Sequence, residues 1–135
     1  MDVMSIAASG MAAAMARLNV SAANTTNAGS QGPLDPGSPV APVAPVSPYQ
    51  AQQLLQTSRK DGGVATEVRK DSRKAQPAYN PASLFANSQG LVAMPAVDLG
   101  LELVNQTLAM DQFKANVRVF EAGDKAMKSL LDIKA

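Results

Sequence analysis

Apolar side chains recur at alternating steps of three and four residues through the last third of the chain, residues 97–135. This spacing places them on one face of an α-helix and is typical of a coiled-coil seam. Asp98 is the predicted N-cap, and no proline follows it. About 33 residues at roughly 1.5 Å each span on the order of 50 Å, so we expect this helix to need a partner outside its own chain. The predicted seam comprises Leu103, Met110, Phe113, Val117, Phe120, Met127 and Leu131.

A surface helix packed on the core of its own small domain is the alternative interpretation, because most amphipathic helices pack in that way. The predicted length is roughly three times the typical 11 to 12 residues and favours an external partner. Gln106 and Asp124 interrupt the seam, and lone polar residues at such positions more often fix helix register than bind a ligand. The opposite face carries Asp111, Lys114, Arg118, Glu121, Lys125 and Lys128.

The start of the chain predicts a second helix of the same kind, over residues 2–24. Its seam comprises Met4, Ala8, Met11, Met15, Leu18 and Ala22. Small residues fill most other positions, and only Asp2 and Arg17 are charged among the first 28 residues. Such a helix is a poor exposed surface, and Gly10 costs about 1 kcal/mol of helix propensity relative to alanine. We therefore expect it to be disordered alone and to fold when other helices surround it.

Turn-forming residues separate the first helix from the middle of the chain, at residues 24–37. Pro39, Pro42, Pro45 and Pro48 then recur every third residue, which matches the turn of a polyproline II helix. We interpret this repeat as a stiff spacer. An SH3-type ligand is the alternative, but no basic residue flanks the prolines.

Two short strands are predicted in the middle of the chain, at residues 49–56 and 63–69. The Asp61-Gly62 pair between them favours a hairpin turn. Six basic and three acidic residues give residues 59–74 a net charge of +3, which indicates a solvated face or, as the sharper hypothesis, a surface for an anionic partner. Residues 75–96 contain three prolines and predict an irregular connector.

These elements predict a mainly α fold, in which long N- and C-terminal helices form a coiled-coil-like pair and enclose a small β-hairpin and an irregular, proline-rich middle. The predicted units are an N-terminal axial helix (1–28), a linker rich in proline and glycine (29–48), a hairpin module (49–74), an irregular connector (75–96) and a C-terminal axial helix (97–135).

The amino-acid composition excludes several kinds of catalytic and metal-binding site. The chain has no cysteine and no histidine, which excludes disulfides, Cys/His metal sites and Ser-His-Asp triads. Its net charge of +1 gives no general case for nucleic acid or an anionic membrane as partner. An enzyme that uses two carboxylates remains an alternative, with Glu67, Asp71 and Asp98 as candidates, although nothing else in the sequence indicates a pocket.

Targeting signals are not expected. A secretory signal peptide begins with positive charge, whereas Asp2 stands here and the first basic residue is Arg17. The apolar run over residues 6–15 is about half the length of a membrane span and contains Ser9 and Gly10. We therefore expect neither a cleavable signal nor a membrane anchor, and export from the cytoplasm would need another route.

Short motifs stand near both ends of the chain and in the connector. Their residues are Leu18, Asn19, Val20, Ala22, Asn24, Asn27, Tyr79, Asn80, Pro81, Ala86, Asn87, Gly90, Val92, Pro95, Val97, Asp98, Glu102, Leu103, Val104, Asn105, Phe113, Ala115, Asn116 and Val117. The first six are similar to the L-x-V-x-A-x-N-x-x-N signature of rod and hook proteins, and the others to a Y-x-P, A-x-x-x-G-x-V-x-x-P-x-V-D segment, E-M-V-N and aromatic-x-A-N-V/I. Together they resemble the flagellar axial proteins, and among them the proximal-rod FlgC family. The match covers both ends and the connector, while the middle agrees only in arrangement.

The chain departs from the family pattern at four places. The Gly-Tyr pair that usually follows the front signature is missing after Asn27. Leu91 stands where the family tends to have tyrosine, and Ala96 where it has asparagine. Asp111 occupies a place where arginine is common, so a family salt bridge should not be carried over to this position.

The resemblance implies a structural, non-enzymatic subunit of the bacterial flagellar basal-body rod, with no cofactor, no metal and no small-molecule substrate. Family members are exported through the flagellar type III apparatus and assemble in the periplasm into the rod that carries torque from the membrane ring to the hook. The implied partners are copies of the chain, other rod proteins, neighbouring membrane-ring or adapter proteins and the export apparatus. A secreted coiled-coil binding module or an export chaperone is the alternative function.

We expect subunit contacts along both terminal helices, where the methionines and Leu18 of the first helix meet the aromatic seam of the last. The predicted interface comprises Met4, Met11, Met15, Leu18, Asn24, Asn27, Leu103, Met110, Phe113, Asn116, Val117, Phe120, Met127 and Leu131.

Overall fold

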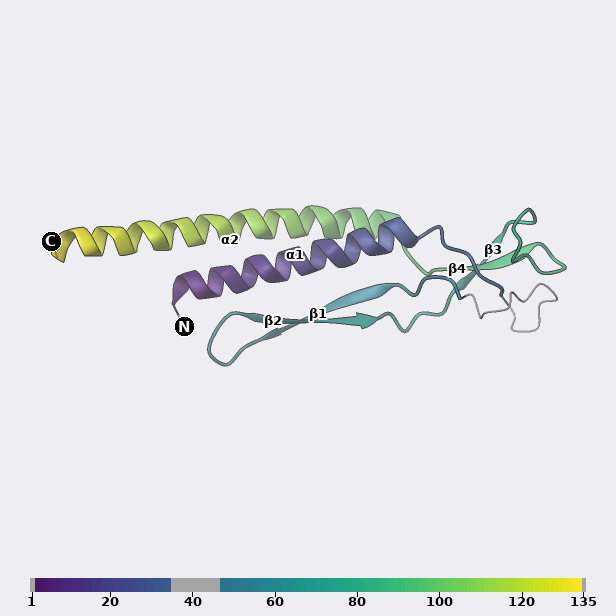
Figure 1. Cartoon of the computed structure of the whole chain (residues 1–135), viewed down its shortest axis with the longest axis horizontal. Helices are drawn as coiled ribbons and strands as arrows, with labels where there is room; N and C mark the ends of the chain where they lie inside the picture. The colour runs from purple at the N-terminus through teal and green to yellow at the C-terminus, as the bar shows by residue number, and fades with distance from the viewer. Residues whose placement is uncertain (1, 35–46, 135) are drawn as a thin grey trace.

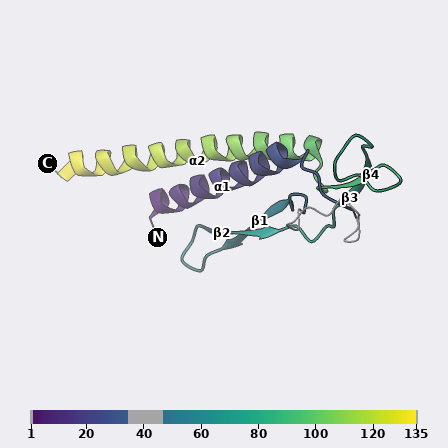
Figure 2. The same ribbon diagram turned by 45° about the vertical axis from the view of Figure 1, so that its right-hand side comes forward.

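The computed structural model describes residues 2–34 and 47–134. In chain order the elements are α1 (Val3–Asn27), β1 (Gln52–Ser58), β2 (Val64–Lys70), β3 (Gln76–Tyr79), β4 (Leu91–Met94) and α2 (Leu99–Lys134). The two helices run antiparallel and side by side, the β1–β2 hairpin lies along α1, and the β3–β4 pair lies near the end where α2 begins (Figures 1 and 2). The expectation of two long terminal helices with a small hairpin between them is confirmed.

α2 begins where the sequence predicts. The Asp98 carboxylate accepts hydrogen bonds from the backbone N–H groups of Gly100 at 2.9 Å and Leu101 at 3.1 Å, which satisfies two of the free donors of the first turn. The helix then continues for 36 residues, which at 1.5 Å each is about 54 Å.

α1 ends later than expected. The prediction that the helix stops at Asn24 is wrong, since it continues to Asn27. The polar side chains of this last turn bond back to their own helix: Thr25 Oγ1 donates to the Ser21 carbonyl at 2.9 Å and Asn27 Nδ2 to the Ala23 carbonyl at 2.8 Å. Residues that usually favour turns therefore extend the helix by one turn.

The first hairpin is confirmed, but β1 is shifted from its predicted limits and begins at Gln52. Its register pairs Ser58 with Val64, so the loop covers residues 59–63. Gly62 and Gly63 have φ values of 89° and 83°, in the left-handed region that glycine adopts without strain. The Asp-Gly signal thus located the turn.

A second hairpin replaces much of the predicted irregular connector, and that prediction is wrong for these residues. β3 pairs antiparallel with β4 from Gln76↔Met94 to Tyr79↔Leu91. In a two-stranded sheet every strand is an edge, so Pro77 can pair without a backbone donor. In addition, Ala93 of β4 exchanges two backbone hydrogen bonds with Gly32, which lies outside the named strands, at 3.0 and 2.9 Å.

The predicted spacer repeat lies mostly outside the described residues. Of its prolines only Pro48 is described, in a stretch without helix or strand that leads to β1.

Small side chains occupy the interior. The buried apolar residues on the two helices are Ala7, Ala13, Ala14, Val20 and Ala109. The largest fully buried side chains are those of Val92, Asn24 and Ser21, and neither leucine, methionine nor phenylalanine is among the buried core residues of the described chain. A methyl group buries far less apolar area than a leucine or phenylalanine side chain, so this core stabilises the single chain weakly.

By length and composition α1 is a helix that could cross a membrane. A packed helix passes the same test, and here α1 contacts both α2 and the hairpin: Ser21 Oγ donates to the Glu102 carbonyl at 2.8 Å, and the Val64 N–H donates to Ser9 Oγ at 3.1 Å.

Candidate assembly surface

The faces by which α1 and α2 meet carry small side chains. A Cβ atom at Gly10 would lie 2.5 Å from Asn116 Oδ1, and one at Gly123 would lie 2.9 Å from Met4 Cγ. On α2, Glu102 and Ala109 are buried. Gly10 therefore leaves room for the Asn116 side chain of α2, and Gly123 for the Met4 side chain of α1.

The large apolar side chains remain at the surface. Leu103 is 65% exposed beside α1, whereas Ala109 is 1% exposed; Leu131, at 67%, lies past the start of α1. Within the chain, the α1-facing stripe of α2 is thus offset by about one residue from the seam predicted by sequence. Further exposed members of that seam are Met110, Phe120 and Met127.

The remaining predicted interface residues lie as follows. Asn24 is buried and Met15 is exposed. The half-buried ones are Met4, Met11, Leu18, Asn27, Phe113, Asn116 and Val117. Four of the predicted residues come together from the two helices around one apolar hollow of about 140 Å³, which Ala14 and Ala109 also line; they are Met15, Leu18, Met110 and Phe113.

A second exposed apolar stripe on α2 was missed by the sequence argument. Leu101 is 53% exposed, Leu108 48% and Val119 45%. Leu101 and Leu108 are seven residues apart, and Leu108, Val119 and Leu130 are eleven apart, so all fall near one line along the helix. This spacing could have identified the stripe. α2 therefore presents apolar side chains on both flanks of the stripe that contacts α1.

The end of α2 extends past α1. Met4, in the first turn of α1, lies beside Gly123, so residues 124–134 project beyond the start of α1 (Figure 1). We call this segment the C-terminal overhang. It carries Met127, Leu130, Leu131 and Ile133, of which Ile133 is 80% exposed. On its polar face Lys128 Nζ pairs with Asp124 Oδ2 at 2.7 Å.

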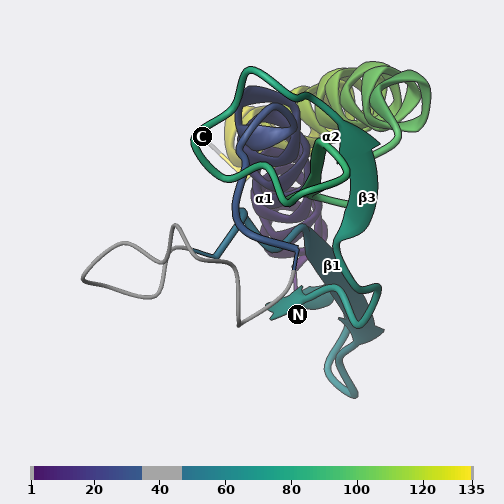
Figure 3. The same ribbon diagram turned by 90° about the vertical axis from the view of Figure 1, so that its right-hand side faces the viewer.

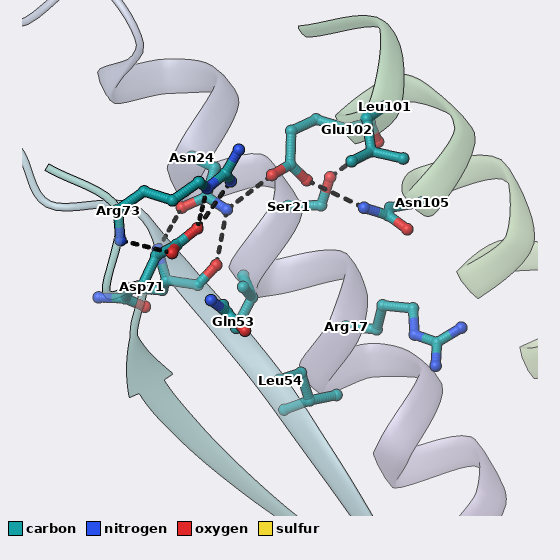
Figure 4. A pocket seen from close by; sticks show the side chains of 12 residues that line it. Arg17, Ser21, Asn24, Gln53, Leu54, Asp71, Arg73, Leu101, Glu102 and Asn105 are labelled. Atoms are coloured by element: carbon teal, nitrogen blue, oxygen red, sulfur yellow. Dashed lines mark hydrogen bonds and ion pairs between the residues drawn. The ribbon is translucent and has the colours of Figure 1, made fainter. Parts of the chain in front are cut away.

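In the view along the helices α1 lies beside both α2 and β1 (Figure 3), and at the C-terminal end of α1 Asn24 connects these three elements (Figure 4). Its amide nitrogen donates to the Gln52 carbonyl at 2.9 Å and to Glu102 Oε1 at 2.8 Å. Its amide oxygen accepts from the Gln52 N–H at 2.8 Å and from the Tyr49 hydroxyl at 3.1 Å. One buried side chain thus ties α1 to β1 and to the first turn of α2, and we call this set of contacts the polar junction.

The polar junction borders a cavity of about 480 Å³ between α1, β1 and α2 (Figure 4). Asp71, whose side chain is 4% exposed, pairs there with Arg73 at 2.6 Å and accepts from the Arg73 N–H at 2.9 Å. These hydrogen bonds from the Arg73 side chain and backbone lower the pKa of Asp71 below its ordinary value of 3.8. Burial and the nearby Glu102 carboxylate raise the pKa of Tyr49.

We expect acid to weaken this part of the molecule. Because the folded-state pKa of Asp71 is lowered, its ion pair stabilises the folded chain fully above pH 3.8, and that contribution is lost as the pH falls through the lowered pKa. A carboxyl ¹³C NMR titration measures the pKa of Asp71 in the folded chain. Arg73→Gln should return the pKa of Asp71 toward 3.8, and an unshifted pKa in the unsubstituted chain would contradict the ion pair.

The carboxylates considered for catalysis have structural contacts. Glu67 pairs with Arg69 at 2.8 Å, Asp71 with Arg73, and Asp98 caps α2. Among the described residues no group of three or more metal-binding side chains occurs.

Terminal helices that bury small side chains and expose large ones are typical of a subunit that associates with other chains through these faces. No family model matches the chain. It is 30% identical over 134 residues to the flagellar basal-body rod protein FlgC of Yersinia enterocolitica and to that of Salmonella typhimurium, with 98% of this chain and 96% of each relative covered. FlgC of Escherichia coli O6:H1 is 30% identical over 139 residues with the same coverage. The chain belongs to the FlgC family of flagellar basal-body rod proteins.

Proposed function

We propose that the chain is a structural subunit of the proximal rod of the flagellar basal body, and that it polymerises through α1 and α2 to transmit torque from the membrane ring to the hook. One observation carries the mechanism: apart from Val20, the large apolar side chains of both terminal helices are exposed or half-buried, whereas most buried residues of these helices are alanine, serine and asparagine. Burying one leucine, methionine or phenylalanine side chain stabilises an interface by about 1.5 to 3 kcal/mol. Assembly is therefore the step that covers these faces.

The proposed interface is the set of predicted apolar residues and Asn116 on both helices, extended by the second stripe of Leu101, Leu108 and Val119. Asn24 and Asn27 act within the subunit: Asn24 bonds to Gln52 and Glu102, and Asn27 bonds to the backbone of its own helix. Asn24 thereby holds α1 in place for assembly, since a docked α1 and α2 together form the surface that neighbouring subunits meet.

The proposed partners are further copies of the chain, other rod proteins, ring or adapter proteins at the base of the rod, and the flagellar type III export apparatus. The proposed location is the periplasmic part of the basal body, reached without a cleavable signal peptide. Family membership gives no support to the alternative of a binding module or export chaperone.

Phe113→Ala tests the proposal at the apolar hollow. Truncating a buried phenylalanine costs about 3 to 5 kcal/mol, and we expect assembly to bury Phe113 fully, so basal bodies with complete rods and swimming should be lost. Electron microscopy of isolated basal bodies measures rod completeness, and a soft-agar motility assay measures swimming. Thr107→Ala, on an exposed position of the same helix, is the control and should swim normally. Unaltered rods in the Phe113→Ala strain would contradict the proposal.

A further inference from the structure

The apolar stripe of α2 that faces α1 does not stop where α1 begins. Met127 follows Phe120 by seven residues and Leu131 follows Met127 by four, which keeps both on the side of α2 that carries Phe113. In the C-terminal overhang this side faces no other described part of the chain (Figure 1). The overhang therefore presents an apolar face that no other described helix of the same chain covers.

The hollow between α1 and α2 is the complementary feature. Its lining is almost entirely apolar, and two of its rim residues, Met15 and Met110, are 45% and 46% exposed. A volume of about 140 Å³ is close to that of protein cavities that hold a benzene molecule, so one leucine-sized side chain fits. Methionine side chains adapt their shape to an inserted group.

Charge at the rim of the hollow also complements the C-terminal overhang. Lys114 lines the hollow, and its pair with Asp111, at 3.6 Å between side chains that are 68% and 66% exposed, holds it weakly. In the overhang an acidic residue, Asp132, directly follows Leu131. Insertion of Leu131 would bring the Asp132 carboxylate to the rim that carries Lys114.

We propose that the C-terminal overhang of one subunit docks in the α1–α2 hollow of a second copy, with Leu131 inserted between Met15 and Met110 and Asp132 beside Lys114. The contact joins two different surfaces, so each docked copy leaves its own hollow or overhang free for the next one. Such heterologous contacts propagate into rings or open helices and do not close as two-fold dimers. The proposal rests on the rod function and adds the partner and the mode of contact.

The contact cannot form within one chain. Leu131 is 18 residues beyond Phe113 on the same helix, which is about 27 Å along its axis, while a disulfide requires Cα atoms within about 7 Å. The chain contains no cysteine, so introduced pairs report without background. A chain that carries both Met15→Cys and Leu131→Cys can therefore be crosslinked only between copies.

We expect this double variant, incorporated into basal bodies and oxidised, to give a ladder of covalent multimers on non-reducing electrophoresis. Each single variant should give no ladder, because one cysteine per chain links at most two chains. The matched control combines Met15→Cys with Ser129→Cys, which lies on the polar side of the overhang, and should give no ladder either.

Two further outcomes separate this inference from the rod function. Basal bodies that contain the double variant without a ladder would overturn the docking and leave the rod function standing. Absence of the unsubstituted chain from basal bodies would overturn both. In the double-cysteine background, Lys114→Glu should lower the ladder yield by about two- to fivefold, and adding Asp132→Lys should restore the yield. An unchanged yield with Lys114→Glu would contradict the contact between Asp132 and Lys114.

Discussion

Phe120→Asp is expected to abolish incorporation of the chain into the rod and, with it, swimming. Phe120 is 38% exposed in the single chain and lies between Phe113 and Met127 at seven-residue spacing. A charge at a partly exposed position is tolerated in a free subunit, but assembly would bury it without a partner, at a cost of several kcal/mol. The substitution also removes an aromatic side chain of the kind that dominates interface energies.

Basal bodies isolated from a strain with Phe120→Asp as its only copy provide the measurement, together with the level of the chain in whole cells. Ser129→Asp adds the same charge to the polar face of α2 and should leave both rods and swimming intact. Normal swimming by the Phe120→Asp strain would show that this part of α2 contacts no neighbouring subunit.

Asn24→Ala is expected to have the second large effect, because it dismantles the polar junction. It leaves the Gln52 N–H, the Gln52 carbonyl and Glu102 Oε1 without their partner. A buried polar group without a hydrogen bond costs about 1 to 3 kcal/mol, so docking of α1 should weaken by about 3 kcal/mol or more, which is on the order of 100-fold. The variant chain should be exported yet largely absent from basal bodies.

Asn27→Ala is the matched control, since among the described residues the Asn27 side chain bonds to the Ala23 carbonyl of its own helix, and the substitution should cost well under half as much. Equal incorporation of the two variants would contradict a special role for Asn24.

Local signals in the sequence were sufficient to predict the two helices and the first hairpin. The three-and-four spacing and Asp98 defined α2, and the Asp-Gly pair located the first hairpin. The second hairpin was missed because prolines were given more weight than the run from Leu91 to Met94, a four-residue apolar segment between Gly90 and Pro95 that is typical of a short buried strand.

Contacts between elements were predicted less well, for a physical reason. Periodicity identifies the most apolar face of a helix, and the sequence argument assumed that this face meets the other helix. In the structure the face of each helix that meets the other also contains glycine: Gly10 leaves room for the Asn116 side chain of α2, and Gly123 for the Met4 side chain of α1. The role of Asn24 as a hub depends on a strand and a helix 28 and 78 residues away, which no local pattern specifies.

Circular dichroism of the purified monomeric chain, followed by a thermal melt, tests the central claim that assembly stabilises the terminal helices. Helix content in the monomer should fall well below the 25 and 36 residues of α1 and α2, without a sharp transition, and should rise when the chain is incorporated into the rod. A monomer with both helices fully formed, melting in one cooperative step, would contradict the claim.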